Sequence, residues 1–206
     1  SAAAYAILDR KRISAQIANA ALEHGRFDLA ETFLRWGGHM VQMQRFLEKA
    51  IKVDDSEGVI RYLEAGADPD GIAAAGAPLI YLAAESGSDA ALETLAAWGA
   101  NLDYHPKKRD LPLLLMANKQ KNLPAFRLLL KHGSDPNVIS DYGYPLTYIC
   151  LRQKQYEWFH LLVDRGADLS YISPTQRTLL DYALRAGHEE SIALLLDKGI
   201  PVMKTT

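Results

Sequence analysis

Cysteine, charge imbalance and long apolar runs are all scarce in this sequence. It contains one cysteine, Cys150, which cannot form an internal disulfide, so a reducing compartment such as the cytoplasm is the expected setting. Lys and Arg number 23 against 25 for Asp and Glu, and the net charge of −2 gives no overall attraction to nucleic acid or to an anionic membrane. No run approaches the roughly 20 apolar residues that a membrane-spanning helix needs. We therefore expect a cytoplasmic chain without a membrane partner, in which any role for charge is local.

Motifs that hold phosphates, metals or catalytic nucleophiles are also missing. The sequence has no Walker-type phosphate loop, no Cys-x-x-Cys pair, no His-Glu-x-x-His and no Gly-x-Ser-x-Gly. Its six histidines are spread along the chain, and Asp68, Asp135 and Asp168 follow glycines at a fixed offset where a turn-forming role is sufficient. We therefore expect no enzyme activity within the chain, no metal site and no cofactor.

One short pattern recurs along the chain. The segments YLEAGADPD, LAAWGANLD, LLKHGSDPN and LVDRGADLS each join the end of an apolar run to a glycine and then to turn-forming residues. A residue just past a helix end commonly takes the left-handed backbone conformation, which glycine adopts without a Cβ clash. The pattern therefore predicts helix ends at steps of 29, 33, 34, 33 and 33 residues, marked by Gly37, Gly66, Gly99, Gly133, Gly166 and Gly199.

Two apolar runs precede each glycine. Runs such as AFRLLLKHG and SIALLLDKG carry apolar residues three and four apart, as one face of a helix requires. Farther upstream, a proline or threonine opens another apolar run, which predicts first helices that begin at Pro78, Pro112, Pro145 and Thr178. A small side chain stands five residues into each of these runs. Cys150 belongs to that column, which favours a buried packing residue over a nucleophile or metal ligand.

Turn-forming residues separate the predicted helix pairs. The linkers, such as SDPNVISDYGY, are 11 or 12 residues long and rich in Asp, Asn, Gly, Pro and Ser. Two helices and a turn-rich extension in every period are typical of a stacked solenoid. Through GADLSYISPTQRTLLDYALRAGHEESIALLLDKG (166–199) and GSDPNVISDYGYPLTYICL (133–151), the chain resembles the ankyrin repeat family. Tetratricopeptide arrays have a similar period of about 34 residues but lack such an extension, so the sequence favours the ankyrin family over them.

The resemblance implies an all-α repeat solenoid in which ankyrin-type helix pairs alternate with β-hairpin or turn fingers. No segment carries the family's full Thr-Pro-Leu-His start, and residues 178–181 come closest to it. We expect a single domain over residues 1–206, with a helical cap at its N-terminal end. Its six modules are predicted at about 13–37, 43–66, 78–99, 112–133, 145–166 and 178–199.

The last predicted helix keeps an apolar face, formed by Ile192, Leu194, Leu195 and Leu196, where a terminal repeat would be polar. Residues 201–203 could cover this face by folding over it. A further repeat of a longer protein, or a second copy of the chain, would do equally well. The sequence therefore leaves the oligomeric state open.

The resemblance also implies where a partner binds, since family members mostly use the finger tips and the inward ends of the first helices. By register these positions carry many basic side chains and tyrosines, which predicts a basic inner face and salt-sensitive binding of an acidic partner. Ordinary solvation of Lys and Arg and packing between fingers would explain the same residues without a partner. The candidate residues are Tyr104, Lys107, Lys108, Arg109, Lys119, Asp141, Tyr142, Tyr144, Arg152, Tyr171, Arg177 and Arg185.

Three functions are compatible with this sequence. The leading one is a non-catalytic protein–protein interaction module, a scaffold, adaptor or inhibitor, that binds a partner with an acidic surface. Basic fingers with tyrosines also suit a nucleic-acid binder, which the balanced total charge disfavours. The apolar last helix suits a third function, the recognition segment of a larger protein such as a secreted bacterial effector.

Overall fold

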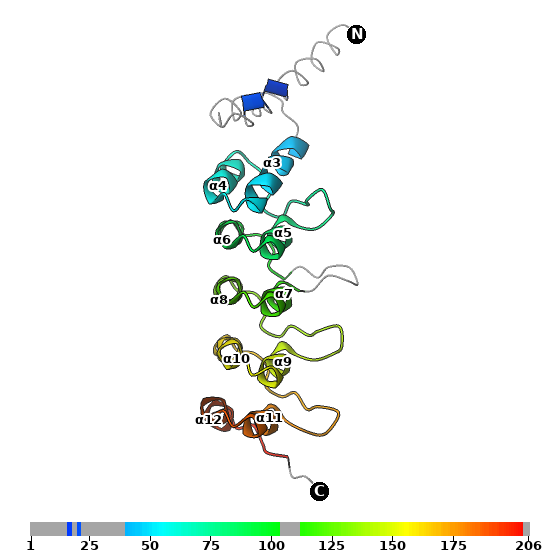
Figure 1. The fold of residues 1–206 in the computed structure, drawn as a ribbon, viewed down its shortest axis with the longest axis vertical. Helices are drawn as coiled ribbons and strands as arrows, with labels where there is room; N and C mark the ends of the chain where they lie inside the picture. The colour runs from blue at the N-terminus through cyan, green and yellow to red at the C-terminus, as the bar shows by residue number, and fades with distance from the viewer. Residues whose placement is uncertain (1–15, 18–19, 22–39, 104–111, 204–206) are drawn as a thin grey trace. The chain divides into compact units, whose positions relative to one another are not determined.

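The computed structural model describes residues 16–17, 20–21, 40–103 and 112–203. Ten α-helices, α3 to α12, lie within these ranges, which contain no β-strand (Figure 1). The predicted N-terminal cap comprises the first two modules, of which that at 13–37 falls almost entirely outside the described residues and that at 43–66 forms a pair of helices. The first module therefore remains a prediction, as does the assignment of all the modules to one domain.

The helices come in pairs within two compact units, residues 1–101 and 102–206. The first unit contains α3 (Met40–Lys52), α4 (Ser56–Glu64), α5 (Leu79–Ser86) and α6 (Asp89–Ala97). The second contains α7 (Leu113–Gln120), α8 (Leu123–Lys131), α9 (Leu146–Arg152), α10 (Tyr156–Asp164), α11 (Leu179–Ala186) and α12 (Glu189–Asp197). None of the helices in the described residues is long and apolar enough to cross a membrane.

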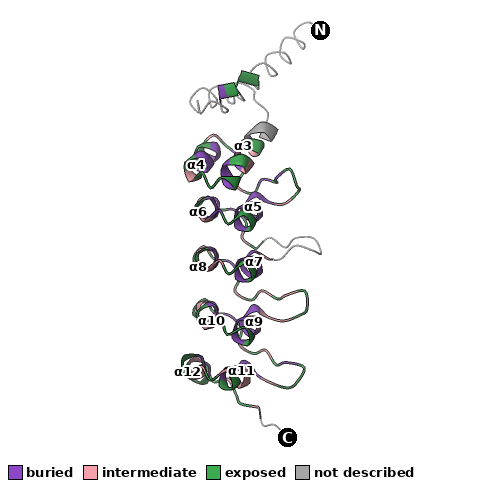
Figure 2. Cartoon of the chain, in the orientation of Figure 1, coloured by how far each residue is buried: buried purple, intermediate pink, exposed green. Residues whose placement is uncertain are grey.

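Stacking of one helix pair on the next buries the apolar helix faces. In the second unit, α7, α9 and α11 form one layer and α8, α10 and α12 the other (Figure 1). Contacts join α9 to α11 and α8 to α10, and in the first unit they join α3 to α5 and α4 to α6. Phe126 on α8 and Trp158 on α10 are both buried, with ring centroids 4.6 Å apart. Figure 2 shows the result, since buried residues lie along the stacked helices, and α5, α7 and α9 are exposed only at their C-terminal ends.

The predicted column of small side chains lies within this packing. Burial raises the pKa of the Cys150 thiol to about 12, and Asn118 Nδ2 donates a weak hydrogen bond to its Sγ at 3.7 Å. Cys150 is therefore a buried packing residue, as predicted. The members of the column are at most 1% exposed: Ala83, Ala117, Cys150 and Ala183.

Backbone conformation at the helix ends confirms the predicted terminators. Their φ angles lie between 72° and 96° at Gly66, Gly99, Gly133, Gly166 and Gly199. The helix starts differ slightly from the prediction, because Pro78, Pro112 and Pro145 are N-cap residues and each helix begins one residue later.

The turn between paired helices needs the same left-handed conformation. Gly187 supplies it between α11 and α12 with a φ of 69°. Lys121 and Lys154 adopt it at the matching positions of the two preceding pairs, with φ angles of 61° and 59°. A residue with a Cβ is strained there by roughly 1–2 kcal/mol.

The described fingers contain turns, one of the two finger types that the resemblance implied, and no β-strand. Each described finger has one isolated antiparallel bridge, as between Ile139 and Pro145. At the tip of that finger, Ser140 N donates to Tyr144 O at 2.9 Å and Gly143 N donates to Ser140 O at 2.8 Å. The arms of the fingers are too short to add further bridges.

Side chains after the stop glycines tie neighbouring fingers together. Asn137 N donates to Asp135 Oδ1 at 2.9 Å and Ser170 N to Asp168 Oδ1 at 2.8 Å, which confirms the predicted turn-forming role of these carboxylates. Asn137 Oδ1 then accepts from the Asp168 backbone N–H at 2.7 Å, which joins one finger to the next. Asp103 Oδ1 accepts in the same way from Asp135 N at 2.9 Å. We call this series of bonds the turn ladder.

We expect Lys154→Gly to raise the free energy of unfolding by about 0.5–1 kcal/mol. Glycine removes the strain of the left-handed conformation, but it loses more conformational entropy on folding than lysine does, which offsets part of the stabilisation. Urea denaturation followed by circular dichroism measures the change. Lys154→Ala removes the side chain and keeps the strain, so an equal gain in this control would contradict the explanation.

Cys150 provides a chemical test of the core. We expect iodoacetamide at about pH 8 to alkylate it far more slowly in the native protein than in urea, because only the thiolate reacts. Burial favours the neutral thiol, so its contribution to stability is fully present below the unfolded thiol's pKa and is lost as pH rises from that value through the folded pKa of about 12. Mass spectrometry follows the reaction, and equal rates in both states would place the thiol at the surface.

Candidate functional site

The predicted partner-binding residues divide into two groups. Tyr104, Lys107, Lys108 and Arg109 lie outside the described residues, so their part in a site stays a prediction. The other eight belong to the second unit, where they occupy the fingers before α9 and α11 or the C-terminal ends of α7, α9 and α11. They are Lys119, Asp141, Tyr142, Tyr144, Arg152, Tyr171, Arg177 and Arg185.

Tyr148, a buried residue of α9, brings several aromatic side chains together. Its ring centroid lies 5.1 Å from that of Tyr144, 5.0 Å from that of Tyr171 and 4.9 Å from that of Tyr182. Arg152 lies one turn later on the same helix, and its Nη1 donates to the Tyr148 hydroxyl at 3.4 Å. We call the four tyrosines the tyrosine cluster. It joins two fingers to two neighbouring first helices, so stacking of the helix pairs creates it.

Hydrogen bonds control ionisation within the tyrosine cluster. Burial, and then a hydrogen bond with Tyr182, raises the pKa of Tyr148. Burial acts in the same direction on Tyr182, but hydrogen bonds with Ser173, Thr175 and Tyr148 outweigh it and lower the pKa of Tyr182. The charge of Arg177 also lowers it. Hydrogen bonds thus converge on the Tyr182 oxygen.

Two of the predicted cations adjoin the tyrosine cluster. Arg152 reaches it through the Tyr148 hydroxyl, and Arg177 acts electrostatically on Tyr182. In the described part of the chain neither guanidinium forms an ion pair with a carboxylate, unlike Arg127, which pairs with Glu157. Arg152 and Arg177 are therefore available to an anionic group of a partner.

The remaining predicted residues are exposed but lie apart from the cluster. Tyr142 is 87% exposed at a finger tip, next to Asp141, and it stacks on no described ring. Lys119 and Arg185 are exposed near the ends of α7 and α11. Like Arg152 and Arg177, both lack a described carboxylate partner.

Sequence reasoning missed Tyr148 and Tyr182. Both lie in the apolar runs of first helices, where an aromatic residue suggests core packing. The only signal was their hydroxyl group, because the positions matching Tyr182 in the three preceding modules hold Leu82, Met116 and Ile149. A hydroxyl among these apolar residues requires a hydrogen-bond partner, and the partners of Tyr182 lie in the finger that precedes α11 and on α9.

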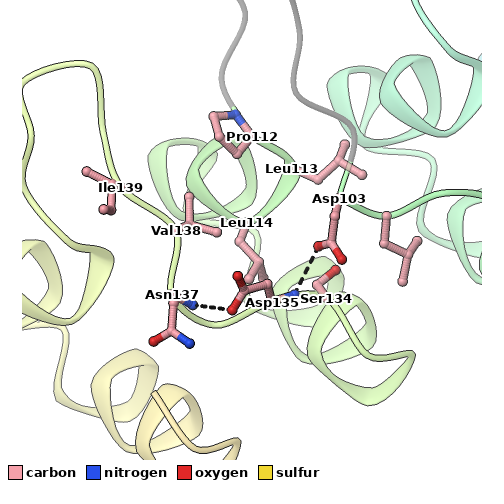
Figure 3. A pocket seen from close by; sticks show the side chains of 10 residues that line it. Asp103, Pro112, Leu113, Leu114, Ser134, Asp135, Asn137, Val138 and Ile139 are labelled. Atoms are coloured by element: carbon pink, nitrogen blue, oxygen red, sulfur yellow. Dashed lines mark hydrogen bonds between the residues drawn. The ribbon is translucent and has the colours of Figure 1, made fainter. Parts of the chain in front are cut away.

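A cavity of about 290 Å³ lies near the base of the finger that precedes α9 (Figure 3). Asp103 and Asp135, which are joined by a bond of the turn ladder, line this cavity, and Leu114 forms an apolar part of its wall. Ser134 is 4% exposed, and its Oγ has no hydrogen-bond partner. Alanine occupies the matching positions 67, 100 and 167, so this buried hydroxyl is an exception among the described modules.

A second cavity, of about 280 Å³, occupies the corresponding place between the fingers before α9 and α11. Its lining combines prolines, Ile139 and Tyr171 with the polar residues Asn137, Asp168 and Thr147. Thr147 is 2% exposed, and its Oγ1 also has no hydrogen-bond partner. We call this space the Thr147 cavity.

A third cavity, of about 470 Å³, lies along the second helices and contains two histidines. Ser191 Oγ lies 2.9 Å from His160 Nε2 and 3.0 Å from His188 Nδ1, and Ser191 N donates to His188 Nδ1 at 3.3 Å. His188 is the N-cap of α12 and Ser191 is fully buried, so helix capping accounts for this arrangement. Among the described residues, no three His, Cys, Asp or Glu side chains are grouped to hold a metal ion.

Comparison with known proteins agrees with the helix pairs of the second unit. A family model described as ankyrin repeats, in three copies, matches residues 113–206. This range contains α7 to α12, together with the tyrosine cluster and most of the lining of both inter-finger cavities. No curated protein matches the chain.

We expect Tyr148→Phe to lower the free energy of unfolding by about 0.5–1.5 kcal/mol, because it removes the hydroxyl that bonds Arg152 and Tyr182 and keeps the ring. Thermal or urea denaturation measures the loss. Tyr142→Phe is the matched control, since that hydroxyl is exposed, and it should leave stability unchanged. Equal stability of wild type and Tyr148→Phe would show that the buried hydroxyl bonds contribute nothing.

Proposed function

Because residues 113–206 of this chain are ankyrin repeats, a family whose members generally bind other proteins, we propose that the chain is a non-catalytic interaction module for a partner with an acidic surface. The contact surface consists of the tyrosine cluster with Arg152 and Arg177, and Lys119 and Arg185 extend it. Its role is that of a scaffold, an adaptor or an inhibitor.

The observation that carries this proposal is the pair of guanidinium groups without carboxylate partners beside the tyrosine cluster. Arg152 and Arg177 each offer several N–H donors in a planar arrangement, which matches the two oxygens of a carboxylate. Tyrosine rings present an apolar face and a polar hydroxyl, and such rings together with arginine dominate binding energy at many protein interfaces. The surface thus combines the two residue types that most often anchor a protein partner.

Charge on this surface is local. The whole chain has a net charge of −2, so distant attraction to polyanions is weak. In the part of the chain that the structure describes, Arg152 and Arg177 pair with no carboxylate. Acidic side chains of a partner would form charge-assisted hydrogen bonds with them. Such contacts speed association and weaken as salt screens the charges.

On this proposal the whole chain forms a single cytoplasmic domain of six modules. By repeat register, Lys107, Lys108 and Arg109 would add three more cations to the proposed surface. Asp141 at the neighbouring finger tip would then limit how far the basic surface reaches.

Selection from a random peptide display library tests the proposal. We expect peptides enriched in Asp and Glu, whose affinity, measured by fluorescence anisotropy, falls as salt is raised. Reversing two charges, with Arg152→Glu and Arg177→Glu, should weaken binding at least about tenfold, because each lost charge-assisted bond is worth roughly 1.5–3 kcal/mol.

Lys198→Glu is the control for each single reversal, Arg152→Glu or Arg177→Glu, since it makes the same change of −2 at the C-cap of α12, outside the proposed surface. It should bind the selected peptides like the wild type. Enrichment of neutral or basic peptides, or equal weakening by the control, would contradict the proposed surface. Tighter binding of labelled single- or double-stranded nucleic acid than of any peptide would favour a nucleic-acid binder instead.

A further inference from the structure

We infer that the outer face of the last helix pair binds a second copy of the chain, so that two copies meet face to face about a two-fold axis. We call this surface the end face. This inference is independent of the proposed acidic-partner surface, because no residue of the tyrosine cluster belongs to the end face. Its residues lie on α11, on α12 and just after α12: Leu184, Ile192, Leu196 and Ile200.

The end face continues the interface that joins the helix pairs of the second unit. In the two preceding pairs, where another pair follows, the residues that match Leu184 and Leu196 are at most 7% exposed: Asn118, Leu130, Leu151 and Val163. In the last pair, Leu184 is 44% exposed and Leu196 is 56% exposed. A terminal repeat is polar at such positions when water covers it. Apolar side chains there indicate that another surface packs on them.

The described residues that follow α12 leave the end face uncovered. Thr178 Oγ1 donates to Pro201 O at 2.9 Å, which holds this part of the tail at the start of α11. Val202 is itself 53% exposed. Leu184 and Leu196 remain exposed with residues 200–203 in place, so this segment does not bury them. Of the coverings that the sequence allows, a further helix pair and a second copy remain.

Charge disfavours a further helix pair stacked like the others. Helices of one layer are parallel in the stack, since Phe126 in the first half of α8 and Trp158 in the first half of α10 have ring centroids 4.6 Å apart. A further pair would therefore place the start of its second helix beside Glu189 and Glu190, which begin α12. Like charges would then meet, which costs free energy. Most other second helices in this chain also have an acidic first turn: Glu57, Asp89 and Glu157.

A second copy brings opposite charges together instead. A two-fold axis that lies in the end face, along or across its helices, sets each helix antiparallel to the helix that it meets in the other copy. The last turn of α11 carries Arg185, while α11 begins with Asp181 in its first turn and α12 with Glu189 and Glu190. Arg185 therefore meets an acidic helix start whichever helix it packs on. The contact occurs twice in the dimer, because a two-fold interface repeats each contact.

Sedimentation velocity of the full chain, at concentrations from about 5 to 500 µM, tests the inference. We expect a reversible monomer–dimer equilibrium with a Kd of roughly 10–300 µM, because two short helices from each copy form a small interface. A monomer at every concentration would overturn the inference. Oligomers that keep growing beyond the dimer would also overturn it, since a two-fold interface closes on itself.

Leu196→Glu tests the apolar contact. It should weaken the dimer at least about tenfold, because it places a carboxylate in the apolar interface of both copies. More than half of this side chain is exposed in the single chain, so the fold should be retained, which circular dichroism checks. Ile139→Glu is the matched control, since Ile139 is 60% exposed on the finger before α9, outside the end face. An unchanged dimer in Leu196→Glu, or an equal loss in the control, would overturn the inference.

Arg185→Glu tests the two-fold arrangement. We expect it to weaken the dimer about fivefold, because it replaces two attractive contacts with repulsive ones. Lys119→Glu makes the same charge change at the matching position of α7 and should leave the dimer unchanged. Equal dimerisation of wild type and Arg185→Glu would overturn the arrangement.

Isotope-filtered nuclear Overhauser effects locate the interface directly. In an equal mixture of ¹³C-labelled and unlabelled chains, we expect cross-peaks between copies at the methyl groups of Leu184, Ile192 and Leu196. A dimer whose cross-peaks map to other residues would overturn the inference. Binding of the selected peptides to the tyrosine cluster does not require self-association, so failure of the end face is distinguishable from failure of the proposed acidic-partner surface.

Discussion

Burial of apolar helix faces between neighbouring helix pairs is the interaction on which the rest of the structure depends. A pair such as α9 and α10 is too small to bury its own apolar residues, and it does so only against α11 on one layer and α8 on the other. Phe126 and Trp158, from consecutive pairs, illustrate this packing. The surface properties follow from it, because stacking fixes which finger lies over which helix.

Two local constraints set the geometry of the stack. Residues in the left-handed conformation end the helices and reverse the chain, and where glycine is absent, as at Lys154, the backbone adopts that conformation under strain. The turn ladder then joins successive fingers through bonds such as that from Asp168 N to Asn137 Oδ1. Fingers held in this way bring Tyr171 onto Tyr148 and leave the Thr147 cavity between them.

The sequence predicts the features that repeat and not those that depend on contact between modules. The glycine period located the helix ends, and the small-residue column identified Cys150 as a core residue, because both signals lie within one module. Tyr148 was missed, since its role depends on the finger of the next module. The sequence left β-hairpin and turn fingers as alternatives, because the choice depends on the bridges between the finger arms, and each described finger forms one isolated bridge, as between Ile139 and Pro145. Thr147 carries a hydroxyl where the matching positions hold Ile80, Leu114 and Leu180. Only the structure shows that this hydroxyl is buried without a hydrogen-bond partner.

The central claim is that stacking of helix pairs within residues 102–206 builds the tyrosine cluster that serves as the contact surface. Nuclear Overhauser effects between aromatic ring protons test it most directly, because Tyr148 is far in sequence from Tyr171 and Tyr182 but has ring centroids 5.0 Å and 4.9 Å from theirs. The account predicts cross-peaks from Tyr148 to both rings in the folded protein. Their absence, in a protein whose α9 and α11 are intact, would contradict it.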